Sequence, residues 1–140
     1  MKRILVLLLT LLSLCGVASA SDSSDLVRAQ RAVTGMLDAI DGEPVPTYKE
    51  LRRNLAAQFQ LMWGESDYAA MRKQTAEKYG RLMDYSFRAF ERLEDFDRLM
   101  YIGSFTRERR VLIIFVLDRE GNITAYRLTP YKPKPKNQTR

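Results

Sequence analysis

The sequence contains no histidine, and its one cysteine, Cys15, lies among the first twenty residues. Without histidine the chain lacks the usual general base, the usual proton shuttle and the commonest metal ligand. A Ser-His-Asp triad cannot form, and a zinc site would have to use carboxylates alone, which is unusual. The seven glycines are scattered and form no phosphate-binding loop. We therefore expect no cofactor and no metal. Carboxylate acid–base chemistry stays an alternative, although Asp38, Asp41 and Asp84 also fit a solvated helix end and the polar side of a strand.

The first twenty residues, MKRILVLLLTLLSLCGVASA, have the pattern of a secretory signal peptide. Two basic residues precede an apolar run over residues 4–14, which is short for a membrane span. Small residues then lead to a cleavage site, and we predict cleavage after Ala20 and a periplasmic or secreted protein. The alternative is a lipoprotein anchored at Cys15, against which Leu14 argues because a small residue is expected there.

Removal of twenty of the 140 residues would leave a chain of ordinary single-domain size. That chain has no cysteine, so packing and not disulfide bonds must stabilise it. We predict one domain over residues 21–131 and a disordered basic tail over residues 132–140, whose Lys-Pro repeats favour an extended backbone.

The net charge of +6 is carried by the two ends of the chain. Two of the positive charges belong to the predicted signal peptide and four to the tail. Residues 21–131 are balanced, with 17 basic and 17 acidic side chains. A neutral body in an exported protein argues against nucleic acid as a partner.

Three helices are predicted in the first half of the chain. Apolar residues at three- and four-residue spacing over 26–40 predict a helix that ends at Asp41-Gly42. A capping box at Thr47–Glu50 opens a second, whose apolar face is expected to run to Met62. The third is expected to begin with Ser66 as its cap and to end at Gly80.

After Gly80 the apolar period changes from about 3.6 to 2, which indicates strands. We predict four, over residues 83–89, 98–105, 111–117 and 122–129, with a type I turn at Asp118–Gly121. Helices followed by strands with short links predict an α+β fold, with N-terminal helices packed on a curved four-stranded antiparallel sheet.

The strand 111–117, VLIIFVL, is apolar on both faces. Helices can cover one face only, so either the sheet curls over its own core or a second copy covers the other face. We therefore predict a homodimer through the sheet, with Leu112, Ile114 and Val116 as candidate contact residues.

Aromatic residues with polar ends are candidates for a ligand pocket, because such side chains often line one. The alternative is that they belong to the core, with the tyrosine hydroxyls reaching its rim. The candidates are Trp63, Tyr68, Tyr85, Tyr101 and Tyr126.

In an up-and-down sheet the turns alternate between its two ends. The acidic turns near residues 94–97 and 118–120 should therefore share one end, and the basic turn 107–110 should lie at the other with the start of the tail. We call this second end the basic pole and expect it to bind an anionic envelope polymer or lipid. The alternative is a solvated turn. The candidate residues are Arg107, Arg109, Arg110, Lys132 and Lys134.

Three stretches, AVTGMLDAIDG (32–42), EKYGRL (77–82) and VLDREGNI (116–123), carry a resemblance to a known superfamily. With this order of elements, the chain resembles the cystatin-like, nuclear-transport-factor-like superfamily and is similar to small exported bacterial domains of unknown function. The resemblance implies a cone-like domain that holds a ligand between helices and sheet and dimerises through the sheet. Some relatives are enzymes that use Tyr, Asp or His in the cone, but this chain has no His and no activity is carried over.

The sequence thus predicts an exported, non-enzymatic binding domain for a small ligand or a partner protein. One alternative is an envelope-interaction or structural protein that acts through the basic pole and tail. The other is a lyase- or isomerase-like enzyme that uses Tyr and Asp.

Overall fold

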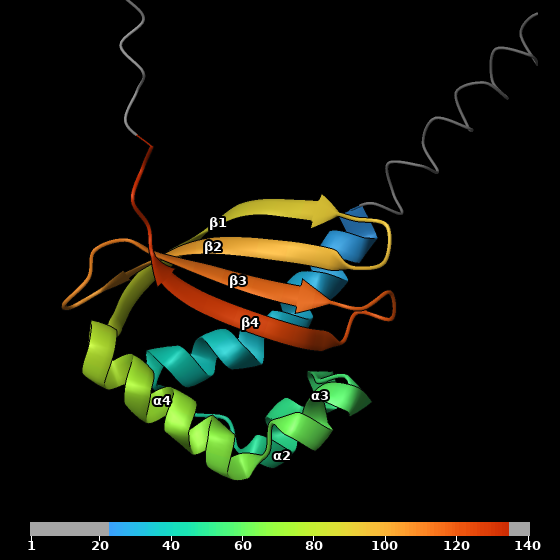
Figure 1. Cartoon of the computed structure of the whole chain (residues 1–140), viewed down its shortest axis with the longest axis horizontal. Coiled ribbons are helices and arrows are strands. Elements are labelled where there is room, and N and C mark those ends of the chain that lie inside the picture. The colour runs from blue at the N-terminus through green and yellow to red at the C-terminus, as the bar shows by residue number, and fades with distance from the viewer. Residues whose placement is uncertain (1–22, 135–140) are drawn as a thin grey trace, which may run out of the picture.

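In a computed structural model, residues 23–134 of the chain are described. The predicted signal peptide, the alternative lipid anchor at Cys15 and the end of the tail lie outside these residues. The described part is an α+β fold in which helices precede a four-stranded antiparallel sheet of order β1-β2-β3-β4 (Figure 1). The predicted fold class is therefore confirmed. No helix within residues 23–134 is both long and apolar enough to cross a membrane.

The first helix covers residues 23–41, as the apolar spacing predicts. Further along lie α2 (Tyr48–Leu51), a 3-10 turn η1 (Arg52–Asn54), α3 (Ala57–Met62) and α4 (Glu65–Tyr79). The predicted capping box is present, since Thr47 Oγ1 accepts from the Glu50 amide and the Glu50 carboxylate accepts from the Thr47 amide.

The prediction of one continuous second helix is wrong. The chain is extended at Leu55 and Ala56, where Leu55 bridges to Ile123 and the Ala56 amide donates to the Ile123 carbonyl at 2.9 Å. These contacts with β4 replace helical hydrogen bonds and turn the chain. Met62, expected on an apolar face, is consequently 75% exposed.

The predicted start of the third helix is also wrong. Gly64, and not Ser66, is the cap of α4, and the Asp67 carboxylate accepts from the Gly64 amide at 2.8 Å. The buried stripe of this helix agrees with its apolar spacing and consists of Tyr68, Met71, Thr75 and Tyr79.

The strands are β1 (Leu82–Arg92), β2 (Asp97–Phe105), β3 (Val111–Leu117) and β4 (Ile123–Pro130). The β3–β4 turn closes as predicted, because Gly121 donates to the Asp118 carbonyl at 3.0 Å and adopts a φ of +85°. In β3, buried and half-buried residues alternate, so its two apolar faces lie in different surroundings.

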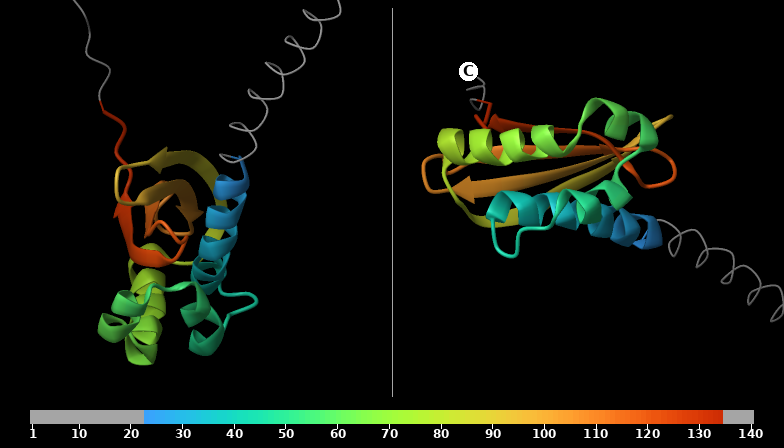
Figure 2. Two further views of the ribbon diagram at one scale, coloured as in Figure 1. Left: turned by 90° about the vertical axis from the view of Figure 1, so that its right-hand side faces the viewer. Right: turned by 90° about the horizontal axis from the view of Figure 1, so that it is seen from below.

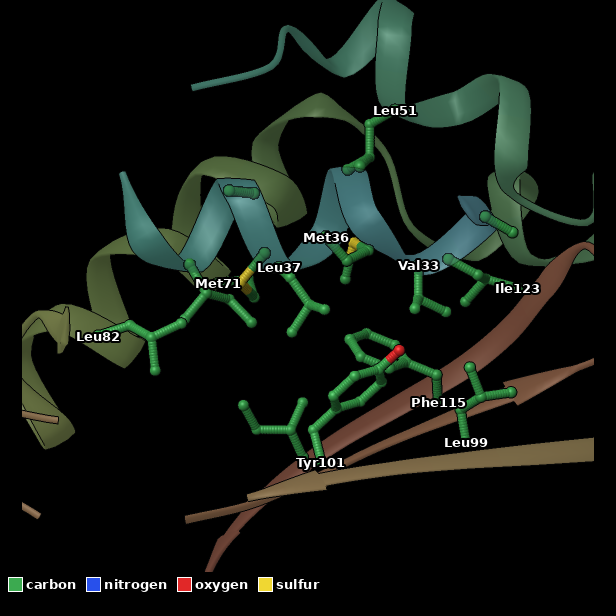
Figure 3. Packing of buried hydrophobic residues seen from close by; sticks show 14 of the residues in the cluster. Val33, Met36, Leu37, Leu51, Met71, Leu82, Leu99, Tyr101, Phe115 and Ile123 are labelled. Carbon is green, nitrogen blue, oxygen red and sulfur yellow. The ribbon is translucent and has the colours of Figure 1, made fainter. Parts of the chain in front are cut away.

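The hydrophobic core lies between one face of the sheet and the helices (Figure 2). Val33, Met36 and Leu37 of the first helix point toward side chains of the sheet (Figure 3). Phe115 of β3 lies at the centre of the core and is fully buried, with its ring 6.2 Å from that of Tyr101 in an edge-on contact.

The other face of the sheet carries Leu112, Ile114 and Val116, whose side chains are half-buried. The described helices all lie on the opposite side of the sheet (Figures 1 and 2). The three candidates for a dimer contact are therefore on the outer face, as the prediction requires.

Candidate functional site

A cleft of about 730 Å³ opens at one end of the molecule. It lies where the ends of the first helix and of α4 meet the start of β1 and the β2–β3 turn. Its walls combine apolar, cationic and acidic side chains, contributed by Ala39, Ile40, Asp41, Gly42, Glu43, Arg72, Ala76, Gly80, Arg81, Leu82, Met83, Thr106 and Arg107.

Gly80 lines this cleft and allows the end of α4 to pack closely against the β2–β3 turn. It ends α4 with a φ of +83°, which favours glycine, and a Cβ atom there would lie 1.9 Å from the Thr106 hydroxyl. That hydroxyl accepts from the Arg81 amide at 3.1 Å, and the Thr106 amide donates to the Arg81 carbonyl at 3.0 Å. The close approach of the two chain segments thus positions Arg81 beside the β2–β3 turn.

Three arginine side chains supply the positive charge of the cleft. Arg72 Nε donates to the Ala39 carbonyl at 3.3 Å, and Arg107 Nη1 donates to the Glu77 carbonyl at 2.6 Å. Both therefore satisfy carbonyls near helix C-termini, where cations are favoured. Arg81 Nη2 contacts the Met83 sulfur at 3.6 Å.

Two carboxylates, from Asp41 and Glu43, line the same cleft. Within residues 23–134, none of the cleft's three guanidinium groups lies within 4 Å of any carboxylate. The cleft therefore contains guanidinium groups and carboxylates that form no ion pairs with each other. Asp38 lies nearby, and partial burial, with a smaller effect of the Asp41 charge, raises the pKa of its carboxyl. No metal-binding group of three or more acidic or other ligand side chains occurs in residues 23–134.

Three of the five aromatic candidates come together, but they form a packed cluster. Trp63 stacks on Phe59 and meets Tyr68 and Tyr126 edge-on, with centroids 5.9 and 5.7 Å away. The Tyr68 hydroxyl donates to the Pro46 carbonyl at 2.6 Å. Burial raises the pKa of Tyr126. The cluster fastens α3 and α4 to β4, and the 730 Å³ cleft is not lined by it.

The other two aromatic candidates lie together on β1 and β2. Tyr85 and Tyr101 meet edge-on with centroids 5.9 Å apart. Burial raises the pKa of Tyr101 to about 12, and burial followed by the charge of Asp38 raises that of Tyr85. Both phenols therefore stay protonated at neutral pH.

The basic-pole candidates lie at the same end as the cleft. The Tyr131 amide donates to the Arg110 carbonyl at 2.8 Å, which brings the start of the tail, with Lys132 and Lys134, to the basic turn. Arg109 and Arg110 are exposed, whereas Arg107 also lines the cleft.

The opposite end has the acidic turns that were predicted there, and its buried carboxylate, Asp97, is paired. Asp97 is 7% exposed and accepts hydrogen bonds from Arg92 and Arg119. Arg92 also pairs with Asp25 of the first helix at 3.0 Å. This network ties the first helix to the sheet.

Two important cleft residues were missed by the sequence reasoning. Arg72 has the pattern of a solvated helix position, and Glu43 belongs to a Pro-rich connector. Neither has a local signal that would single it out, because the cleft exists only where distant segments meet.

Comparison with known proteins does not assign the chain to a family. No protein family, curated protein or solved structure matches the chain. The resemblance to the cystatin-like superfamily therefore stays a prediction.

Proposed function

We propose that this chain is an exported, non-enzymatic binding domain that takes a small zwitterionic ligand in the 730 Å³ cleft. The observation that carries the proposal is the presence of Arg72, Arg81 and Arg107 with Asp41 and Glu43 in one cleft, without ion pairs between the two sets. A ligand with one anionic and one cationic group would supply partners for both, and charged hydrogen bonds are among the strongest. Export is supported by the signal-like pattern of the first twenty residues.

The size and lining of the cleft favour a molecule of the size of a short peptide. Its volume lies within the range of small-molecule sites, roughly 300–1,000 Å³. Ile40 and Leu82 add apolar surface beside the charges. A dipeptide has a carboxylate for the arginines, an ammonium group for the carboxylates and side chains for the apolar wall.

The raised tyrosine pKa values argue against a tyrosinate general base at neutral pH. A phenol that stays protonated at neutral pH is a poor general base. This applies to Tyr85, on which the charges of Asp38, Asp41 and Asp84 act, and to its neighbour Tyr101.

The experiment compares alanyl-alanine with its C-terminal amide and its N-acetyl derivative by isothermal titration calorimetry. Each derivative removes one of the two ligand charges, so both should bind more weakly than the dipeptide. In Arg81→Gln the dipeptide and its amide should bind alike, and in Glu43→Gln the dipeptide and its acetyl derivative should bind alike. Arg109→Gln is the control for Arg81→Gln, because Arg109 lies on the neighbouring basic turn but outside the cleft.

Equal binding of all three ligands to the unaltered protein would refute the zwitterion site. Envelope interaction through the basic pole is the second candidate, favoured by the exposed Arg109 and Arg110 beside the start of the tail. No dipeptide binding, together with salt-sensitive binding to anionic lipid vesicles that Arg109→Gln weakens, would replace the first proposal with this one.

A further inference from the structure

The two edges of the sheet differ in how they are covered. The β4 edge is protected: Leu55 bridges to Ile123, the Ala56 amide bonds to the same residue, and the strand ends at Pro130. At the other edge, every residue of β1 from Met83 to Arg88 is exposed. An uncovered strand edge offers free backbone donors and acceptors to another strand.

The open edge also carries exposed apolar side chains. Met83, Tyr85 and Phe87 are 58%, 39% and 40% exposed. Tyr85 and Phe87 each meet the buried Tyr101 edge-on, which leaves part of both rings uncovered. A strand added at this edge would cover them.

We propose that β1 pairs in antiparallel fashion with β1 of a second copy, about a twofold axis at Ser86. In this register Asp84 lies opposite Arg88 of the second copy, and Arg88 opposite its Asp84. Tyr85 lies opposite Phe87 of the second copy, so that each interface contains two ion pairs and two aromatic pairs. Such cross-strand pairs are the unit of sheet stabilisation. The two sheets become one continuous sheet.

The charges of this segment support a second copy as its occupant. Asp84 accepts from the Tyr85 amide at 2.8 Å, and within residues 23–134 neither Asp84 nor Arg88 takes part in an ion pair. The stretch DYSFR is therefore self-complementary when it is read antiparallel to itself. An isologous contact requires this property.

The ion pairs between Asp84 and Arg88 select the register, and two irregularities of β1 lie on either side of Ser86. The register against β2 shifts between Leu82 and Asp84 and again between Phe87 and Ala89. The regular segment between these β-bulges covers residues 84–87 and contains Ser86, whereas Arg88 has no partner in β2. A register slipped by one or more residues would separate Asp84 from Arg88 of the second copy and remove the ion pairs.

Charge reversal tests the proposal with native mass spectrometry and sedimentation of the purified protein. Asp84→Arg and Arg88→Asp each place like charges opposite one another twice, so the dissociation constant should rise by at least about tenfold. The double variant Asp84→Arg/Arg88→Asp restores both pairs and should dimerise as the unaltered protein does. A mixture of the two single variants should form a heterodimer, because one then carries two positive and the other two negative residues.

Two controls exclude unfolding and contact through the outer face as causes of a changed oligomeric state. All variants should keep the circular dichroism spectrum of the unaltered protein, since both positions are exposed. Ile114→Lys changes the outer face of the sheet and should leave the edge dimer intact. A protein that is monomeric throughout, or a dimer that Ile114→Lys dissociates and the charge reversals do not affect, would overturn the proposal. Because Asp84 and Arg88 lie outside the cleft, the outcome is independent of ligand binding.

Discussion

Replacement of Gly80 by alanine is the perturbation whose cost the structure specifies most closely. Gly80 has φ +83° and ψ −153°, a region that other residues rarely adopt. The added Cβ would lie 1.9 Å from Thr106 Oγ1 and 3.2 Å from Thr106 Cβ. The backbone is therefore strained and the Thr106 side chain must move.

The magnitude follows from these two effects. A residue held in such a region costs about 1–3 kcal/mol. Displacement of the Thr106 hydroxyl also breaks its 3.1 Å hydrogen bond with the Arg81 amide, which costs about 0.5–1.5 kcal/mol. We expect Gly80→Ala to lower the free energy of unfolding by roughly 2–4 kcal/mol.

Gly42→Ala is the matched control. Gly42 also has a positive φ, +91°, but nothing lies within 4 Å of the position that its Cβ would occupy. Gly42→Ala should therefore lower the free energy of unfolding through backbone strain alone. Urea denaturation measures the free energy of unfolding of both variants. A lower denaturation midpoint at an unchanged dependence on urea concentration reports a loss of stability.

The comparison has two results that would refute the reasoning. If Gly80→Ala lowers the unfolding free energy by less than about 0.5 kcal/mol, the backbone strain is not real. If it costs no more than Gly42→Ala, Thr106 does not lie against Gly80. In the Thr106→Ala background the cost of Gly80→Ala should decrease, because the displaced hydroxyl is absent.

Two further predictions concern the core. Phe115→Ala should lower the free energy of unfolding by about 3–5 kcal/mol in urea denaturation, because Phe115 is fully buried. Val116→Ala changes the half-buried outer face and should lower it by less. Equal losses would contradict the assignment of the two faces. The pKa of Tyr101 is raised from 10.0 to about 12, so the folded state keeps a proton that the unfolded state loses, and stability should fall as the pH rises from about 10 through 12. Tyr101→Phe should flatten this part of the stability–pH curve, and an unchanged curve would contradict the shift.

Much of the fold was predictable because local rules decide it. The change of apolar period after Gly80 separates helices from strands, and the predicted strand 111–117 coincides with β3. The Thr47–Glu50 capping box and the Asp118–Gly121 turn form because the groups that satisfy one another lie within four residues.

Tertiary contacts decided what the sequence alone did not reveal. The second helix breaks at Leu55 because distant Ile123 offers its backbone as a partner, and no local pattern announces that contact. The cleft forms because packing brings Arg72 to the end of the first helix and Arg107 to the end of α4. Residue type and spacing determine which elements form, whereas the meeting of side chains far apart in the chain depends on how those elements pack.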